Sequence, residues 1–530
     1  MQRIRLESAN HRSHILFGVI GILGFLLIWT TTAKGVEVGH DASRYIFAAR
    51  GVISGIGFSQ YDGGGILKPF NHFPPLYPLL LAIPSIVGVD PLGAARLIAA
   101  IIFGANIYMI SLLLYQSTAS VLFSLLGGLM VLTSPVMFDQ HVAAMSEPLY
   151  FLLLLLLLYS IVHYSREEKK IWLLLSGFFT ALAYLTRYIG ISLAFSGCLM
   201  LLMINRENAR CRIKQVVTYL VISIGPILPW YIRNYSLTGS INNRVSIFHP
   251  ISILQLKTAF HTISAWLSPN TIPNRTRAIA LLFLAAGLIF LRIRRGHIKP
   301  SLNKPSPLLS RRLDSLLLHD LALISAVTYG VFVIISVSFF DAASRLTDRI
   351  LSPLFIPGVI ICVIAVYQIT GNLKNRTLSK WIIALVIVFF LSAYSYQTWA
   401  KVVSFREYGR AFTSREWVNS PTVEHIRKLS PEVFIYSNEM YALDFLADRP
   451  VYSVPEKVDP VKEEERENYE ELYNEMMSNL WEGKAVLVIF PPINKRPGLP
   501  TMEEVTSGLV MLDEFRDGQV YAIPGFSQEE

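Results

Sequence analysis

Most ionisable side chains in the first 400 residues stand beside long apolar runs and not inside them. Those with the chemistry of acids, bases or phosphate ligands are Asp41, Arg44, Lys68, His72, Asp139, His141, Glu147, Arg187, Arg345, Asp348 and Arg349. Ionisable groups at a membrane boundary are costly unless they are paired or functional. Because acids and bases from several loops share this position, we expect them to form one site for an anionic lipid head group.

Four of the basic residues are candidates for holding a lipid phosphate: Lys68, Arg187, Arg345 and Arg349. Arginine suits phosphate because its planar guanidinium offers a fork of donors and stays charged. The alternative for each is a side chain that reaches lipid head groups from the edge of the membrane. Arg187 and Arg349 directly adjoin apolar runs, which favours them as ligands. For Arg44 we expect a salt bridge to a nearby acid.

The elements that position these residues are membrane-spanning helices. Hydrophobic residues make up 52% of the 530 and charged residues 16%, whereas soluble domains carry roughly 25% charged residues. A hydrocarbon core about 30 Å thick needs about 20 apolar residues in a helix. The runs that qualify, or nearly so, are 14–33, 92–115, 118–135, 147–164, 171–186, 188–204, 215–232, 277–293, 318–340, 350–370 and 381–400. The sequence therefore predicts a polytopic α-helical membrane protein with about eleven spans.

Lysine and arginine in the loops predict how these spans are oriented. Basic residues concentrate in alternate loops, around 3–12, 166–170, 206–214, 292–312 and 374–380. Loops of this kind face the cytoplasm, so we expect a cytoplasmic N-terminus in a cell membrane. Most of the basic residues behind the net charge of +9 lie in short loops between apolar runs, and no nucleic-acid partner is expected. Tyr231, Tyr235, Tyr394 and Tyr396 fit aromatic belts at the membrane surface.

Two further segments follow from composition. Residues 75–89 are apolar but short and carry Pro78 and Pro84, and we interpret them as an interfacial or re-entrant helix. The composition becomes that of a soluble protein near Lys401. We therefore expect a transmembrane domain at 1–400, with a first exterior loop at 34–91, and an extracytoplasmic α/β domain at 401–530. Its expected strands are 433–436, 485–490 and 520–523, with a charged helix at 463–481.

Several short motifs stand at the ends of the apolar runs. They are Asp41 with Tyr45, Pro74-Pro75-Leu76-Tyr77-Pro78, Gly88-Val89-Asp90-Pro91-Leu92-Gly93-Ala94-Ala95-Arg96, Ser146-Glu147 and Arg349-Ile350-Leu351. Together they resemble the GT-C membrane glycosyltransferases that use polyprenyl-phosphate sugars, including the protein O-mannosyltransferases and the lipid A aminoarabinose transferases. Each motif is short, and the resemblance rests on their conjunction along the whole chain.

The resemblance implies an enzyme that moves a sugar from a polyprenyl-phosphate donor to a protein, lipid or glycan acceptor, with inversion at the anomeric carbon. The family's general base is the acid of the first exterior loop, which is Asp41 here, and Glu147 matches its second acidic position. Phosphate is already a good leaving group, so the reaction needs one carboxylate to accept a proton and cations to hold the departing phosphate. The alternative is local: Asp41 would cap a helix beginning at Ala42, and Glu147 would follow an N-cap at Ser146.

The sequence leaves the cofactor and a second functional class open. Asp139 and His141 could join Glu147 in a metal site, although one histidine among carboxylates is a poor indication of a metal. Some relatives use a divalent ion and others do not. The competing function is a membrane transporter or lipid flippase, which would favour paired broken helices and ionisable groups near the membrane midplane. Neither feature is evident in the sequence.

Overall fold

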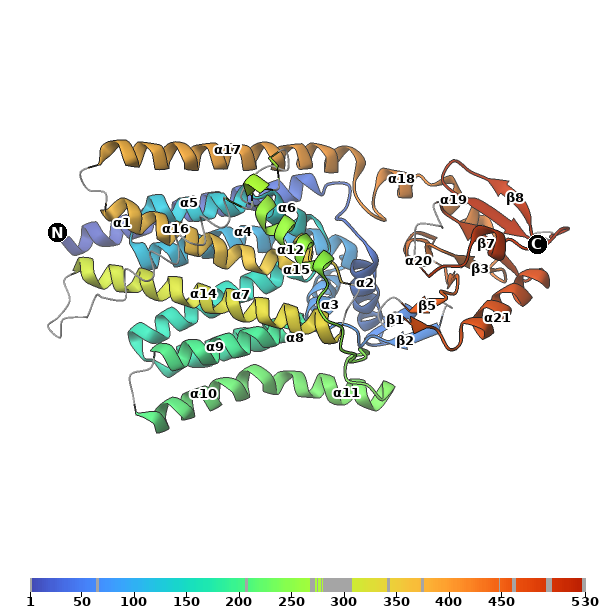
Figure 1. Ribbon diagram of the computed structural model, residues 1–530, viewed down its shortest axis with the longest axis horizontal. Helices are drawn as coiled ribbons and strands as arrows, with labels where there is room; N and C mark the ends of the chain where they lie inside the picture. Colours follow the sequence, from blue (N-terminus) through green and yellow to red (C-terminus); the bar gives the residue numbers. More distant parts are fainter. Residues whose placement is uncertain are drawn as a thin grey trace.

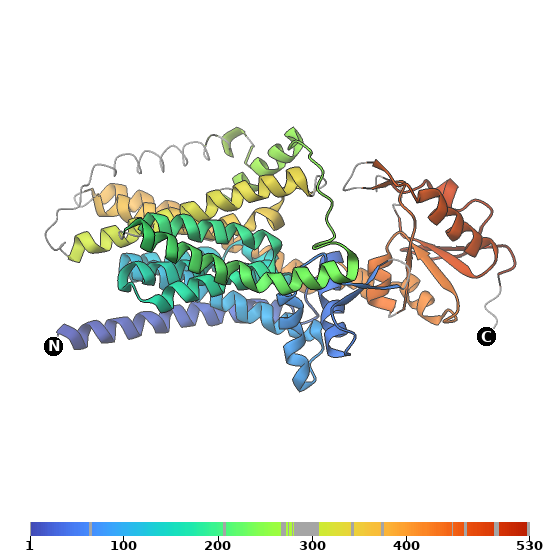
Figure 2. The same cartoon turned by 90° about the horizontal axis from the view of Figure 1, so that it is seen from below.

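The structure is a computed structural model with a helical bundle and, beyond one end of it, a part built around a β-sheet (Figure 1). It describes residues 2–62, 66–204, 208–266, 272–273, 275–277, 279, 307–340, 344–372, 376–447, 449–459, 464–491 and 498–526. The N-terminus lies at the end of the bundle far from the sheet (Figure 2). The chain therefore begins and ends at opposite extremes of an elongated molecule.

Long apolar helices make up the bundle. They are α1 (Gln2–Thr31), α4 (Pro91–Thr118), α5 (Val121–Leu132), α6 (Pro135–Val142), α7 (Glu147–Glu167), α8 (Lys170–Thr186), α9 (Ile191–Ile204), α10 (Ala209–Ile224), η3 (Gly225–Ile227), α11 (Leu228–Thr238), α14 (Pro307–Phe339), α16 (Phe355–Asn372) and α17 (Thr377–Tyr408). In the described part of the chain, seven helical segments are long and apolar enough to cross a membrane, or eight if the bent pair α5–α6 is one span.

The predicted spans coincide with helices of the bundle. A helix occupies each of them except 277–293, which lies almost wholly outside the described residues. The polytopic α-helical membrane fold is therefore confirmed, and the number of about eleven spans stays a prediction. Small residues let the helices approach closely. A Cβ at Gly21 of α1 would come within 2.9 Å of the carbonyl oxygen of Gly104 in α4, which is the close packing that small residues provide between membrane helices.

Short elements connect or break the long helices. They are α2 (His40–Ile53), β1 (Ser59–Asp62), β2 (Ile66–Pro69), α3 (Leu76–Ala82), η1 (Ile83–Val87), η2 (Tyr188–Gly190), α12 (Ile253–Ala265), α15 (Asp348–Leu351) and η4 (Ser352–Leu354). The helices α2 and α3 and the hairpin β1–β2 lie between the bundle and the sheet (Figure 1). The segment α3–η1 is too short to cross a 30 Å core, and its Ile86 and Val87 are 86% and 79% exposed. These features suit the interfacial position predicted for residues 75–89.

The part that follows α17 contains a mixed five-stranded sheet in the order β4-β3-β7-β9-β8. Its elements are α18 (Arg415–Val418), α19 (Pro421–Lys428), β3 (Phe434–Ser437), α20 (Met440–Ala447), β4 (Tyr452–Ser453), β5 (Val458–Asp459), β6 (Glu464–Glu465), α21 (Tyr469–Trp481), β7 (Ala485–Ile489), α22 (Met502–Val505), β8 (Val510–Glu514) and β9 (Gln519–Ala522). The strands β4, β3 and β7 run parallel, and β9 and β8 are antiparallel to their neighbours. Apolar residues of α19 and α20 cover one face of the sheet and those of α21 cover the other.

Candidate active site

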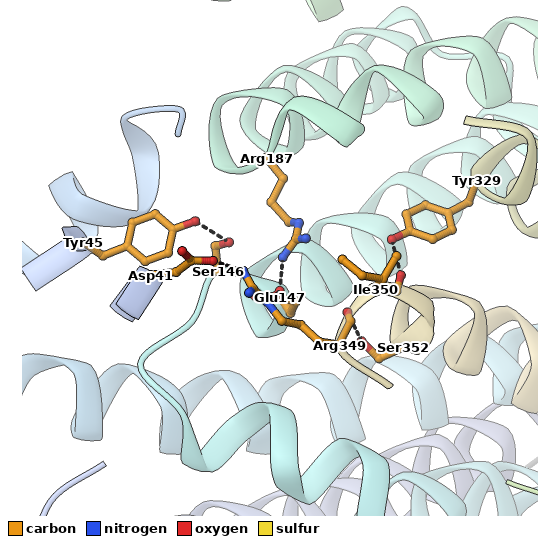
Figure 3. A network of polar contacts seen from close by, with 9 residues as sticks. All are labelled: Asp41, Tyr45, Ser146, Glu147, Arg187, Tyr329, Arg349, Ile350 and Ser352. Atoms are coloured by element: carbon orange, nitrogen blue, oxygen red, sulfur yellow. Dashed lines mark hydrogen bonds and ion pairs between the residues drawn. The ribbon is translucent and has the colours of Figure 1, made fainter. Parts of the chain in front are cut away.

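Arg349 joins two acids from distant parts of the chain. Its guanidinium forms an ion pair with Asp41, and its Nε donates a hydrogen bond to Glu147 Oε1 at 3.1 Å. Arg187 forms an ion pair with the same oxygen of Glu147. The four side chains converge from α2, α7, the junction of α8 with η2, and α15 (Figure 3). The structure thus brings together Asp41, Glu147, Arg187 and Arg349 in one polar network.

The first turn of α2 presents Asp41 to this network. The helix begins at His40 after the N-cap residue Gly39, so Asp41 is the second residue of the helix and not its N-cap. The alternative that Asp41 merely caps a helix is therefore wrong. One turn later, Tyr45 forms a hydrogen bond between its hydroxyl and Ser146 Oγ at 3.1 Å (Figure 3). Ser146 stands at the N-cap of α7, but its side chain makes no cap hydrogen bond, so its hydroxyl joins α7 to α2.

Hydrogen bonds to the backbone fix the segment that carries Arg349. The Tyr329 hydroxyl of α14 donates to the carbonyl oxygen of Ile350 at 2.7 Å, and Ser352 Oγ donates to that of Arg349 at 3.2 Å (Figure 3). Trp266 Nε1 donates to Asp348 Oδ1 at 2.8 Å. Since α15 is only four residues long, these contacts from other elements hold the guanidinium in place.

The carboxylate of Glu147 is fully buried, whereas Arg187 keeps 14% and Arg349 42% of the side chain exposed. Burying a carboxylate is costly unless cations and hydrogen bonds offset the lost hydration. Two guanidiniums provide this for Oε1, and Oε2 accepts no hydrogen bond from a described residue. Glu147 is not among the residues that line the neighbouring cavity. Its geometry therefore suits a residue that holds the two arginines.

A cavity of about 410 Å³ opens beside the network. Asp41, Arg187 and Arg349 line it, together with Arg244, His72 and a set of aromatic residues that includes Tyr184, Tyr188, Tyr231 and Tyr329. Ligand pockets typically enclose roughly 300–1,000 Å³. The cavity has the size and the mixed polar and aromatic lining of a site for a charged sugar head group.

Charges around the cavity set the protonation of two of its residues. Burial by itself raises the pKa of Asp41, but the adjoining guanidinium of Arg349, with smaller contributions from Arg44 and His72, outweighs burial and lowers this pKa below its usual value. Burial and the charge of Arg244 lower the pKa of His72 to about 4. At neutral pH the cavity therefore presents an ionised Asp41 and an uncharged His72.

Two of the basic residues predicted to hold phosphate lie apart from this network. Lys68 is exposed on β2, and Arg345 is exposed ahead of α15. Neither lines the cavity. Arg44, for which we expected a salt bridge, has no ion pair with a described residue. It donates instead to the Tyr441 hydroxyl, and its guanidinium lies 4.8 Å from the centre of that ring.

The three residues considered for a metal site belong to separate networks. Asp139 forms ion pairs with Lys401 and, at 2.8 Å, with Arg410. His141 donates from Nδ1 to the carbonyl oxygen of Met137 at 2.6 Å and accepts at Nε2 from Asn106 at 3.1 Å. Glu147 pairs with the two arginines described above. Among the described residues, no group of three or more His, Cys, Asp and Glu side chains is placed to hold a metal, so we assign no step to one.

Sequence reasoning missed several residues of the cavity. Arg244 follows α11 in a stretch without a recognisable motif, and its only signal is a positive charge in a loop that the sequence predicts to be exterior and poor in such residues. Its Nε is buried and has no hydrogen-bond partner among the described residues. The interpretation of Tyr231 as part of an aromatic belt is wrong. Its hydroxyl bonds to that of Tyr184 at 2.8 Å, and its ring stacks on Tyr188 with 6.0 Å between centres, on the cavity wall.

Residues 72–232 match the family model described as dolichyl-phosphate-mannose-protein mannosyltransferase. None of the curated proteins matches the sequence. The chain is similar to ArnT from Cupriavidus metallidurans bound to undecaprenyl phosphate, with 14% identity and a TM-score of 0.59 over 97% of this chain and 99% of that one. The apo state of ArnT gives 14% identity and a TM-score of 0.60, with 97% and 98% covered.

A larger protein shares the same architecture. The arabinofuranosyltransferase AftD from Mycobacteria aligns with 96% of this chain and 40% of its own, at 12% identity and a TM-score of 0.55. The likeness to ArnT extends over both chains almost from end to end. These matches confirm the resemblance that the sequence motifs indicate: the chain has the fold of the GT-C membrane glycosyltransferases.

Proposed function

We propose that this protein is an integral-membrane glycosyltransferase that moves a sugar from a polyprenyl-phosphate donor to an exterior acceptor. The observation that carries the proposal is the cavity in which one ionised carboxylate, Asp41, faces the arginines Arg187, Arg244 and Arg349. A sugar joined to a lipid phosphate requires this combination of a base and a phosphate site. The likeness to ArnT, whose structure contains undecaprenyl phosphate, supports the same donor class.

The reaction is a single displacement. The acceptor hydroxyl oxygen bonds to the anomeric carbon while the bond from that carbon to the phosphate oxygen breaks. The hydroxyl proton moves to Asp41, and the electron pair of the broken bond leaves with the polyprenyl phosphate. The cavity arginines stabilise the charge that the phosphate gains. Attack from the side opposite the leaving group inverts the anomeric centre.

The ion pair of Arg349 with Asp41 suggests how the base becomes available. Arg349 contacts two carboxylates, and a donor phosphate entering the cavity competes with Asp41 for the guanidinium. Arg349 remains anchored through Glu147 while it turns toward the phosphate. Asp41 is then released from the ion pair and can accept a proton. In this account Glu147 positions the arginines and does not touch the substrate.

The placement in the membrane follows from the basic loops. With these loops in the cytoplasm, the cavity and the sheet-containing part lie outside. The helix α2, which carries the cavity residue Asp41, and the sheet are both at the end of the bundle opposite the N-terminus (Figure 1). We propose that residues 1–400 form the transferase domain and residues 401–530 an extracytoplasmic domain, in the cell membrane. The donor head group then reaches the cavity from the outer leaflet, and the acceptor is a protein, lipid or glycan.

Transfer assays test the proposal directly. The full chain in lipid nanodiscs is incubated with a panel of radiolabelled undecaprenyl-phosphate sugars and with acceptors of the three classes. Wild type transfers at least one sugar, and Asp41→Asn lowers the rate by roughly 1,000-fold or more because it removes the base. Asp90→Asn is the matched control in the same loop: Asp90 caps α4 by accepting from the amide of Leu92 at 2.9 Å, and asparagine caps equally well.

The assays also distinguish glycosyl transfer from the competing function, lipid transport. A lipid transporter would move a labelled polyprenyl-phosphate sugar across a vesicle bilayer without breaking its sugar–phosphate bond. Such movement, with no transfer by wild type from any donor, would overturn the proposal. Transfer by Asp41→Asn at the wild-type rate would remove Asp41 as the base.

A further inference from the structure

Residues 36–38, just ahead of α2, lie between two other backbone segments. On one side, the amide of Glu37 donates to the carbonyl oxygen of Val142 at 2.8 Å, and that of Ala144 donates to Glu37 at 2.9 Å. On the other side, the amide of Phe412 donates to the carbonyl oxygen of Val38 at 2.9 Å. The bridges 37–143 and 38–411 are both parallel. We call these three segments, 36–38, 142–144 and 411–413, the ladder.

The ladder stands immediately before both acids of the network. Asp41 follows its central segment, and Glu147 follows the segment 142–144. Because the hydrogen bonds fix these two segments against each other, the ladder sets the spacing between the start of α2 and the start of α7. That spacing determines whether Arg349 can contact both carboxylates.

Arg410 forms ion pairs with acids in and beside the ladder. Its Nη1 lies 2.8 Å from Asp139 Oδ1 and 3.8 Å from Glu37 Oε2. Lys401 of α17 forms a second ion pair with Asp139. The side chains of Arg410, Glu37 and Asp139 are 30%, 30% and 19% exposed. Arg410, which directly precedes the segment 411–413, is therefore linked to Glu37 in the segment 36–38 and to Asp139 in α6, the helix that ends at Val142 in the third segment.

The backbone beside Arg410 is held in an uncommon conformation. Gly409 has a φ of +66°, and a Cβ there would lie 2.8 Å from the carbonyl oxygen of Thr413. Ala411 has a φ of +50° although it is not a glycine. A left-handed alanine persists only where its surroundings impose it. Thr413 Oγ1, which donates to the carbonyl oxygen of Val36 at 2.6 Å, is part of those surroundings.

We propose that Arg410 is a positioning residue for the transfer reaction, acting through Glu37, Asp139 and the ladder to hold Asp41 and Glu147 in register. The proposal rests on the proposed function, because it assigns the reaction to Asp41. Arg410 does not line the cavity, so it affects the rate of the chemical step and leaves donor binding to the cavity arginines.

Steady-state kinetics provide the first test, with a donor and acceptor that wild type uses. Arg410→Gln lowers kcat by roughly 10- to 100-fold, since a displacement of about 1 Å at the reacting groups costs this much. The KM for the donor changes by less than about three-fold, because no binding contact is removed. Arg410→Lys, which keeps the charge, recovers part of the loss. Arg406→Gln is the matched control, an exposed arginine in the last turn of α17, four positions before Arg410.

Hydrogen–deuterium exchange supplies a readout independent of activity. In donor-free nanodiscs, Arg410→Gln speeds exchange of the amides in 36–46 and 142–150 several-fold, and Arg406→Gln leaves them unchanged. Should Arg410→Gln fail to fold, Asp139→Asn breaks the same ion pair from the other side and must give the same pattern.

The kinetic and exchange results together support or overturn the role proposed for Arg410. Slower turnover with faster exchange in both segments supports the proposal. Unchanged kcat in Arg410→Gln, an effect confined to the donor KM, or unchanged exchange overturns it. If wild type transfers no sugar from any donor, the proposed function fails, and the exchange data alone then decide whether Arg410 holds the ladder.

Discussion

Arg349 and Asp41 are 308 positions apart in the sequence and form an ion pair at the cavity wall. The contact places a fixed cation against the one carboxylate of the network that lines the cavity. It lowers the pKa of Asp41 against the opposing effect of burial. The proposed base and a proposed phosphate ligand are thus electrostatically dependent on each other.

The pH dependence of transfer reports on this pair. Asp41 accepts a proton only when it is ionised, so a lowered pKa moves the acidic limb of the rate profile below the usual value for aspartate, near pH 4. We expect kcat/KM to show no loss from Asp41 between about pH 5 and 8. Arg349→Gln removes the cation and leaves the burial, which moves the limb upward. An acidic limb at the same pH in wild type and in Arg349→Gln would contradict the assignment of Asp41 as the base that Arg349 controls.

Arg349 and Arg345 allow a matched comparison four residues apart. Arg349→Gln removes a phosphate contact that strengthens in the transition state, and we expect kcat/KM to fall by roughly 100- to 1,000-fold. Arg345 is exposed and does not line the cavity. Arg345→Gln therefore changes kcat/KM by no more than two- to three-fold, or about 0.5 kcal/mol. Equal losses in the two variants would show that the structure places the wrong arginine in the cavity.

Removal of the buried carboxylate should destabilise the fold. Glu147→Gln leaves the buried Arg187 without its counter-charge and Arg349 with Asp41 alone, and breaking a buried pair in this way typically costs about 3–5 kcal/mol. The midpoint of thermal unfolding in detergent measures the loss. Glu168→Gln, at the other end of the same helix and exposed, serves as the control. A midpoint unchanged by Glu147→Gln would refute the structural role given to Glu147.

Arg244 should contribute to binding of the lipid phosphate. A hydrogen bond to a charged group is worth about 1.5–3 kcal/mol, so Arg244→Gln weakens binding of undecaprenyl phosphate by roughly 10- to 100-fold. Titration of nanodisc-embedded protein with this lipid measures the change. Arg210→Gln, at an exposed position at the start of α10, tests whether charge alone matters. Equal affinity in Arg244→Gln and wild type would exclude a phosphate contact at this residue.

The sheet-containing part should become less stable as the pH rises. Burial raises the pKa of Asp444 in α20 to about 7, although its Oδ1 accepts a hydrogen bond from the amide of Val451 at 2.8 Å. A raised folded-state pKa makes the folded state bind the proton more tightly. The free energy of unfolding therefore falls by up to roughly 4 kcal/mol between about pH 4 and pH 7. Above pH 7 it no longer changes through this group.

Asp444→Asn keeps the acceptor and cannot ionise, so it should abolish this pH dependence. This pH dependence is measured by hydrogen exchange of the amides in 440–454 between pH 5 and 8, with the rates corrected for the intrinsic effect of pH. The same pH dependence in the variant would show that another group is responsible.

The sequence by itself determined the class of fold and much of the architecture. In a single apolar run that crosses a bilayer, the backbone N–H and C=O groups find their hydrogen-bond partners only in a helix. All the predicted spans that lie in the described residues are accordingly helical. The strands predicted at 433–436, 485–490 and 520–523 coincide with β3, β7 and β9. Strand β8 was missed because its side chains are mostly exposed, which leaves no apolar pattern to recognise. These are local properties, set by composition and period within one element.

Only the tertiary structure decided which charged residues share a site. The sequence offered Lys68, Arg187, Arg345 and Arg349 as phosphate ligands and favoured Arg187 and Arg349, and the fold placed those two in the network. It added Arg244, and it paired Asp139 with Arg410 beside the ladder. Ion pairs between residues hundreds of positions apart depend on how separate helices pack, and that packing leaves no pattern in the spacing of residues along a single chain.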